Sequence, residues 1–212
     1  MQTNLQHVHP PPPRVFQYSL DWRFLLPISD PAKIRVAFEE EADFSEALDR
    51  VGIPVSNLLS FSNFKQHESK SIHSLAFPFG LPARWVGSRQ QEQIEFYRSV
   101  RHLICPGGYL LLGFGNAWTP HPGAQYRLST PPRMVNQLDQ AGFKAITVLG
   151  AIPDLRIPEY IFDLNVQVMH FTLTHRFRRK TVLLNMLRML AETVGLARIA
   201  NFLPCYFVVA SV

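Results

Sequence analysis

The residues best suited to chemistry gather in one irregular loop, Gly113 to Gln125 (GFGNAWTPHPGAQ), which Tyr126 follows. Glycine, proline, asparagine and tryptophan break any regular periodicity there, as expected of a loop that follows a strand. His121 stands between two prolines that restrict its backbone, and imidazole titrates near neutral pH, so His121 is a candidate general base. The other candidates for the substrate side are Asn116, Trp118 and Tyr126. A rigid surface loop without a ligand is the alternative interpretation.

A second histidine, His73, lies in an expected strand, Ser71 to Phe79 (SIHSLAFPF). It is a candidate catalytic group if it lines a pocket at the end of that strand, and otherwise an ordinary structural histidine. The two cysteines, Cys105 and Cys205, are far apart in sequence and show no metal-ligand spacing. The sequence therefore predicts no metal site and no disulfide.

The stretch from Tyr97 to Asn116, YRSVRHLICPGGYLLLGFGN, positions this loop. Its first part continues a helical periodicity of apolar residues, which are Ile94, Tyr97, Val100, Leu103 and Ile104. Pro106 is expected to end the helix, and Gly107 and Gly108 to reverse the chain. The apolar run Tyr109 to Leu112 then predicts a strand that is covered on both faces.

Two motifs of this region resemble those of the class I S-adenosylmethionine-dependent methyltransferases. The run LICPGG, Leu103 to Gly108, is similar to the helix end and Pro-Gly-Gly turn before the fifth strand of that family, with Cys105 where lysine is common. The run LDQAGF, Leu138 to Phe143, is similar to the helix end before the sixth strand. The two matches stand in the family's order, about 35 residues apart.

The resemblance implies an α/β fold of Rossmann type, with a mostly parallel sheet and a C-terminal antiparallel strand. The expected strands are Lys33 to Phe38, Val55 to Phe61, Ser71 to Phe79, Tyr109 to Leu112, Ala145 to Leu149 and Cys205 to Ala210. Asn63 to Lys70 is too short for the family's third strand, which we expect to be missing or vestigial. Gly150 to Leu164 is expected to be a proline-punctuated connector, and residues 165–203 a helical insertion before the last strand.

The same resemblance implies a cofactor site in the loop after the first strand. In the family an acidic residue and a glycine-rich run lie there, and an acidic residue at the end of the second strand holds the ribose. The corresponding positions here are Glu39, Glu41, Asp43 and Ser60, which become the candidate residues for S-adenosylmethionine. No glycine stands between Glu39 and Asp43, so side chains occupy a loop that needs bare backbone. A solvated acidic loop that holds no ligand is the alternative.

Residues 1–19 predict a disordered, proline-rich arm, and residues 20–212 a single methyltransferase-like domain. Trp22 belongs to an apolar segment, DWRFLLP, expected to form a short helix or turn against the sheet. In the family, a similar aromatic segment covers the substrate side.

The composition indicates which partners and which cellular compartment are expected. The chain has 212 residues, 47% of them hydrophobic and 17% charged, as in globular domains. The net charge of +5 is mild and no nucleic-acid motif accompanies it, so nucleic-acid binding is not expected. The sequence shows neither a secretory signal nor an apolar run of membrane-spanning length, and a cytoplasmic location is the expectation.

Three functional hypotheses remain open. The first is methyl transfer from S-adenosylmethionine to a small-molecule, saccharide or lipid-linked substrate. The second is an inactive or repurposed member of the family that acts as a binding or partner subunit, so enzymatic activity is uncertain at this stage. The third is contact with an anionic membrane through residues 175–200, which begin with the basic run HRFRRK.

Overall fold

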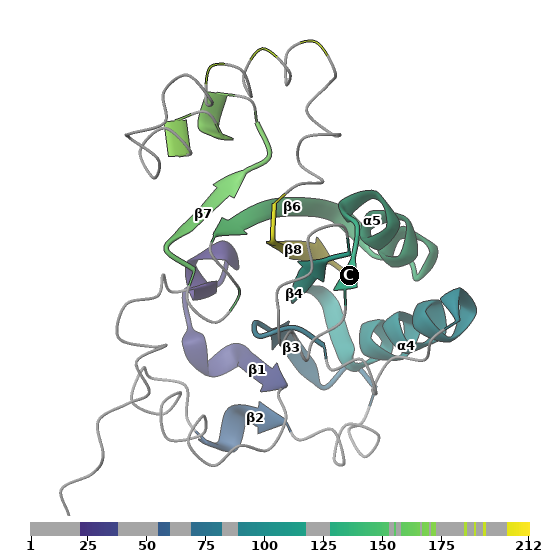
Figure 1. The fold of residues 1–212 in the computed structure, drawn as a ribbon. Helices are drawn as coiled ribbons and strands as arrows, with labels where there is room; N and C mark the ends of the chain where they lie inside the picture. The colour runs from purple at the N-terminus through teal and green to yellow at the C-terminus, as the bar shows by residue number, and fades with distance from the viewer. Residues whose placement is uncertain are drawn as a thin grey trace, which may run out of the picture.

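The computed structural model describes residues 22–37, 55–59, 69–81, 89–117, 128–152, 155, 158–165, 167–169, 171–172, 185, 189, 193 and 203–212. These residues form one eight-stranded sheet in the order β2-β1-β3-β4-β8-β6-β7, with the short β5 paired to β4 (Figure 1). The strands are β1 Ile34–Ala37, β2 Leu58–Leu59, β3 Ile72–Phe77, β4 Ile104–Asn116, β5 Leu128–Ser129, β6 Lys144–Ile152, β7 Tyr160–Asp163 and β8 Cys205–Ser211. The helices are α4 Gln90–Leu103 and α5 Pro131–Gln140, with 3-10 turns η1 Trp22–Leu25, η2 Pro31–Lys33 and η3 Val55–Asn57.

The sheet is mostly parallel. β1 pairs in parallel with β2 and β3, and β3 pairs in parallel with β4. β8 lies between β4 and β6 and is antiparallel to both, as the sequence predicted for the last strand. Within the described part of the chain, β1 is the only strand that pairs with β2, in agreement with a missing third strand. The carboxyl ends of β1, β2, β3, β4 and β6 consequently share one edge of the sheet.

α4 forms where the sequence predicted a helix, but its end differs from the prediction. The Arg89 backbone N–H donates to Glu92 Oε2 at 3.1 Å and closes the first turn. The helix ends at Leu103, and Ile104 is already extended and pairs with Ile72 of β3. The helix therefore stops before Pro106, because a proline disfavours helical backbone in the residues that precede it.

The Pro-Gly-Gly segment is a bulge within β4 rather than a turn between two elements. Ile72 pairs with Ile104 while Ser74 pairs with Tyr109, so β4 carries three more residues than β3 over this interval. Gly107 adopts a φ of +77°, which favours glycine. The C-terminal residue Val212 pairs with the bulge through backbone hydrogen bonds of 3.3 Å and 3.1 Å.

α5 follows its sequence signals closely. Thr130 is the N-cap residue, and Pro131 occupies the first turn, where a missing N–H costs little. Gly142 ends the helix with a φ of +91°, and its N–H donates to the Asp139 carbonyl at 2.8 Å. Phe143 then leads into β6, as the sequence predicted.

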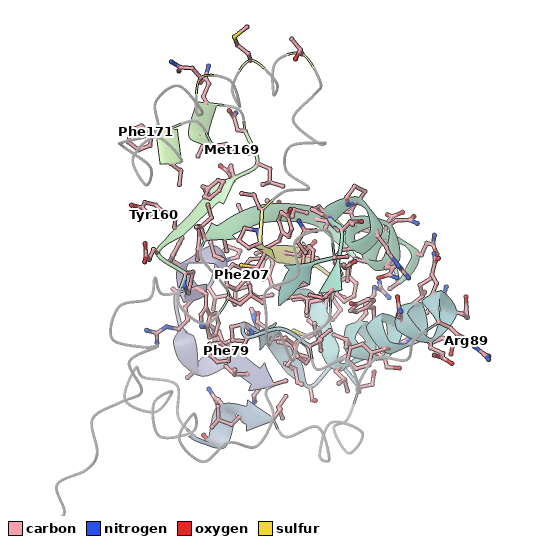
Figure 2. The ribbon with its side chains drawn as sticks, viewed as in Figure 1. Phe79, Arg89, Tyr160, Met169, Phe171 and Phe207 are labelled. Carbon is pink, nitrogen blue, oxygen red and sulfur yellow. The ribbon has the colours of Figure 1, made fainter. Side chains whose placement is uncertain are left out.

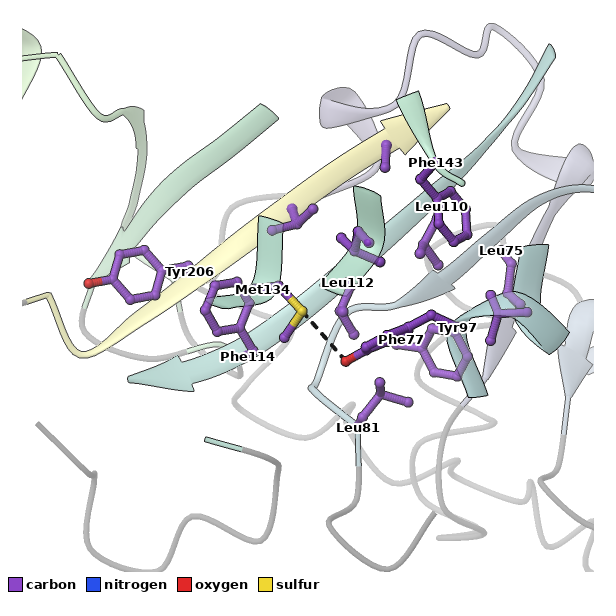
Figure 3. Packing of buried hydrophobic residues seen from close by; sticks show 14 of the residues in the cluster. Leu75, Phe77, Leu81, Tyr97, Leu110, Leu112, Phe114, Met134, Phe143 and Tyr206 are labelled. Atoms are coloured by element: carbon purple, nitrogen blue, oxygen red, sulfur yellow. Dashed lines mark hydrogen bonds between the residues drawn. The ribbon is translucent and has the colours of Figure 1, made fainter. Parts of the chain in front are cut away.

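Alternating side chains of the strands build a core on each face of the sheet. Leu110, Leu112 and Phe114 of β4 pack on the face that α4 and α5 cover, and Leu111 packs on the other. On the helical face, the Tyr97 hydroxyl donates to Met134 Sδ at 3.5 Å and joins α4 to α5 (Figure 3). The opposite core contains Trp22 and Phe207.

The prediction of an irregular connector over Gly150 to Leu164 was wrong in part. β6 continues to Ile152, and Tyr160–Asp163 forms β7, antiparallel to β6 at that edge of the sheet. Gly150 permits this pairing, because a Cβ there would lie 3.1 Å from the Phe162 ring and 2.6 Å from Leu203 Cδ1. Phe162, shortly before the predicted insertion, and Leu203, its last residue, thus meet over Gly150.

β2 is shorter than predicted, because its first residues form η3. The Asn57 amide holds this turn, since Nδ2 donates to the Ala32 carbonyl at 2.8 Å and Oδ1 accepts from Arg35 Nη1 at 2.7 Å. Of the described residues 55–59, Leu58 and Leu59 pair with β1.

Candidate functional site at the carboxyl ends of the parallel strands

The edge beyond β1 is the switch point of the sheet. From β1 the chain moves to β2 on one side, and β3 then lies on the other side. In open α/β sheets such a reversal leaves a crevice at the carboxyl ends, where ligands bind. Ala37, Leu59 and Leu81 are buried beneath this edge, and Gly80 has a φ of +89° in the turn that follows β3. The topology thus makes this edge the candidate position for a ligand.

The four candidate cofactor residues, Glu39, Glu41, Asp43 and Ser60, lie outside the described residues. The strands that precede them are described. Ala37 of β1 pairs with Leu59 of β2, so the two neighbouring strands reach the edge together. The segments that contain the candidate residues follow β1 and β2 in the sequence and therefore begin at the switch point.

Asn116 is the last residue of β4 and is fully buried. Its Nδ2 donates to the Leu203 carbonyl at 2.6 Å and to the Tyr206 hydroxyl at 3.2 Å, and its backbone N–H donates to the Pro204 carbonyl at 2.9 Å. Asn116 therefore lies at the predicted edge, but its amide is bonded to the segment that enters β8. Its role in the structure is to hold that segment against the end of β4.

β5 brings the candidate loop back to its starting point. Gly115 pairs with Leu128 and Asn116 pairs with Ser129, while the Ala117 N–H donates to the Ser129 carbonyl at 3.0 Å. Both ends of residues 118–127 are therefore fixed beside the carboxyl end of β4. The candidates within that loop, Trp118, His121 and Tyr126, lie outside the described residues.

Tyr206 belongs to this edge, although the sequence analysis did not select it. Its ring stacks on Phe114 with centroids 5.2 Å apart, and both rings are buried (Figure 3). Burial raises the pKa of the Tyr206 hydroxyl well above its usual value, against a smaller opposing effect of a backbone hydrogen bond with Leu203. The sequence signal was only an apolar strand, CYFVVA, in which a tyrosine suggests packing rather than a polar contact.

We expect Tyr206→Phe to change how stability depends on pH. Below pH 10 the hydroxyl is protonated in both states, and the wild type should be more stable by about 1 kcal/mol through the Asn116 hydrogen bond. Above the unfolded pKa of 10.0 only the unfolded chain ionises. The wild-type advantage should then fall by about 1.4 kcal/mol per pH unit. Urea unfolding of the wild type and of Tyr206→Phe at pH 8 and above pH 10 measures this difference in unfolding free energy. A difference that does not change with pH would contradict the raised pKa of Tyr206.

His73 does not lie at this edge. It is the second residue of β3 and is exposed, and its Nδ1 lies 3.1 Å from Oγ of the buried Ser74. Because β3 is parallel to β1 and β4, its amino end lies on the side of the sheet opposite the crevice. The strand direction therefore separates His73 from the candidate site.

Trp22 forms the predicted short helical turn, η1, but its side chain is buried in the core. It packs in the cluster that contains Val36 of β1 and Phe207 of β8. The structure thus gives Trp22 a packing role.

Among the described residues, no group of three or more His, Cys, Asp or Glu side chains is placed to hold a metal ion. None of the helices described is both long and apolar enough to cross a membrane.

No protein-family model matches the sequence, and no curated protein matches it. Solved structures, however, match the fold of this chain. A SAM-dependent methyltransferase from Archaeoglobus fulgidus superimposes with a TM-score of 0.50 at 12% identity, covering 84% of this chain and 85% of that one. A possible histamine N-methyltransferase from Thermotoga maritima gives a TM-score of 0.47 at 12% identity, covering 85% and 74%. Together with the strand order and the antiparallel β8, the first of these shows that the chain has the fold of the class I S-adenosylmethionine-dependent methyltransferases.

Proposed function

We propose that this protein binds S-adenosylmethionine at the carboxyl ends of β1 and β2 and transfers the methyl group to a small-molecule, saccharide or lipid-linked substrate. The observation that supports the proposal is the switch point of the sheet, where β1 lies between β2 and β3 in parallel register. Methyl transfer is the reaction that agrees with this fold, since structural neighbours of this chain are named as enzymes of that class.

The residues that would hold the methyl donor are Glu39, Glu41, Asp43 and Ser60. The donor carries a positive sulfonium and a positive ammonium, which carboxylates attract, and a carboxylate, which they repel. A cluster of acids can therefore bind the cationic groups only if the donor's carboxylate points away from it. Ser60 can hydrogen-bond a ribose hydroxyl as a neutral partner, which is weaker than a carboxylate would be.

The loop 118–127 would provide the substrate side, because both of its ends are fixed beside β4. Bound S-adenosylmethionine supplies an electrophilic methyl group. His121 would accept the proton that a substrate N–H or O–H releases, and the prolines on either side limit its backbone freedom. Trp118 and Tyr126 would pack against the substrate.

Thermal unfolding tests the cofactor assignment. At S-adenosylmethionine concentrations about 100-fold above Kd, binding to the native state adds about 2.7 kcal/mol of stability, which corresponds to a rise of about 5 °C or more in Tm. Ser60→Asp should bind about tenfold more tightly, because a carboxylate accepts ribose hydroxyl bonds more strongly. Ser60→Ala is the matched control and should bind less tightly than the wild type. No shift in the wild type or in Ser60→Asp with millimolar S-adenosylmethionine or S-adenosylhomocysteine would remove this proposal.

A second candidate function has its own supporting observation. The segment Glu39 to Asp43 contains no glycine, so side chains stand where the backbone would have to approach the cofactor. A chain of this fold that has lost the cofactor would act as a binding or partner subunit. This alternative predicts no thermal shift with the methyl donor, so the same experiment decides between the two.

A further inference from the structure

We propose that the predicted insertion, residues 165–203, docks this protein on an anionic lipid bilayer. The charge distribution is the first observation. The insertion contains six basic residues and a single acidic one, Glu192, and this excess equals the chain's whole formal charge of +5. The rest of the chain carries fifteen basic and fifteen acidic residues and is neutral. A positive potential is thus confined to one segment, as electrostatic attraction to anionic lipid requires.

Exposed apolar side chains lie in the same segment. Phe171 is 73% exposed, Val168 is 37% exposed and Met189 is 66% exposed. Val168 and Phe171 are three positions apart in helical backbone and therefore lie on one side of it. Figure 2 shows Phe171 on the part of the chain that extends beyond β7, away from the sheet. Exposed apolar side chains that are close in sequence to cations are typical of surfaces that enter the membrane interface.

The base of this segment is fixed to the core. Met169 and Thr172 are buried, and they are also three positions apart, so the helical backbone has a covered side as well as an exposed one. The Met169 N–H donates to the Asn165 carbonyl at 2.8 Å. Leu203, at the end of the insertion, is buried over Gly150. The exposed residues therefore project from an anchored element.

Chain length brings the basic residues close to Phe171. His175 begins the run HRFRRK four residues after Phe171, and four residues span at most about 14 Å. The run contains Arg176, Arg178, Arg179 and Lys180. Cations at that range from an inserted phenylalanine can reach lipid phosphates, which lie at the depth of the membrane interface.

Met189 lies on a helical part of the insertion. Asn185, Met189 and Thr193 are helical and exposed, and Thr193 Oγ1 donates to the Met189 carbonyl at 2.8 Å. Their spacing of four puts them on one face. In the sequence, Leu183, Leu187, Leu190 and Val194 follow the spacing of a single helical stripe, so this part of the insertion is rich in apolar residues.

Co-sedimentation with vesicles tests the proposal on the full chain without any cofactor. We expect binding to phosphatidylcholine vesicles with about one third phosphatidylglycerol, and little to pure phosphatidylcholine. Raising salt from about 0.1 M to 1 M shortens the Debye length from about 10 Å to 3 Å and should release most of the protein. Arg178→Gln with Arg179→Gln should weaken binding about 30-fold, and Phe171→Ser about tenfold.

Phe24→Ser is the matched control, because Phe24 is 62% exposed on η1, outside the insertion. It should leave vesicle binding unchanged, and circular dichroism should show all variants folded. Equal, negligible binding to both vesicle types overturns the proposal, and so does anionic binding that Phe171→Ser and the arginine variants leave unchanged. Binding to nucleic acid without binding to vesicles also overturns it. Since the assay contains no methyl donor, its failure does not affect the proposed cofactor site.

Discussion

Gly108→Ala is expected to destabilise the fold by about 3 kcal/mol or more, because the added carbon has no space. A Cβ at this position would lie 2.1 Å from the His73 carbonyl oxygen, 2.6 Å from Ile104 Cγ2 and 2.9 Å from the Cys105 carbonyl oxygen. The His73 carbonyl belongs to the backbone of β3, so relief of this contact requires β3 and β4 to separate. Urea unfolding followed by circular dichroism measures the loss.

Gly107→Ala is the matched control in the neighbouring position. Gly107 has a φ of +77° and a Cβ there would meet no atom within 4 Å. Alanine would suffer only the backbone strain of the left-handed region, about 1 kcal/mol. If the two variants lost the same stability, the bulge would not bring Gly108 as close to β3 as the structure shows.

Phe207→Ala is the second change with a large expected effect. Phe207 is fully buried in β8, opposite Gly113 of β4 and Leu149 of β6. Removing its ring leaves a cavity beside two strands, which should cost about 3 to 5 kcal/mol. Because a domain is typically stable by about 5 to 15 kcal/mol, this variant should unfold at a much lower urea concentration.

Phe24→Ala provides the comparison for Phe207. Phe24 is 62% exposed, so its truncation should change stability by at most about 0.5 kcal/mol. Urea titrations of both variants and the wild type give the unfolding free energies, and hence the stability that each truncation removes. Similar losses of stability for the two phenylalanines would contradict a central position of β8 in the sheet, with a packed core on each face.

The sequence predicted the elements whose signals are local. α5 has prolines at its start and glycine at its end, and both occur where the structure needs them, whereas the hydroxyl of the N-cap residue Thr130 makes no capping hydrogen bond. β4 and β8 were predicted because Tyr109–Leu112 and Cys205–Ala210 are too apolar for anything but a doubly covered strand. A missing third strand was predicted from the short sequence between Asn63 and Lys70, and among the described strands only β1 pairs with β2.

Features that depend on distant contacts were predicted less well. β7 has four residues and forms only because Gly150 of β6 leaves room for Phe162. The bulge at Gly108 depends on the approach of His73, which is 35 residues earlier in the sequence. Such contacts are set by the sheet as a whole, and no local pattern reports them.

In the candidate site, too, local features were predicted and features that depend on distant contacts were not. Asn116 was correctly placed at the end of a strand, but its bonds to Leu203 and Tyr206 join residues about 90 positions apart. His73 was selected as a titratable group on a strand, and only the direction of that strand shows that it lies at the far edge.

The most direct test of the account is hydrogen–deuterium exchange with and without saturating S-adenosylhomocysteine. A ligand at the switch point should slow exchange in peptides that span the ends of β1 and β2, around Ala37 and Leu59, while peptides of β7 and α5 stay unchanged. Slower exchange at those two strand ends is the predicted result. No change in any peptide, or protection confined to other parts of the chain, would contradict a methyl-donor site at this edge.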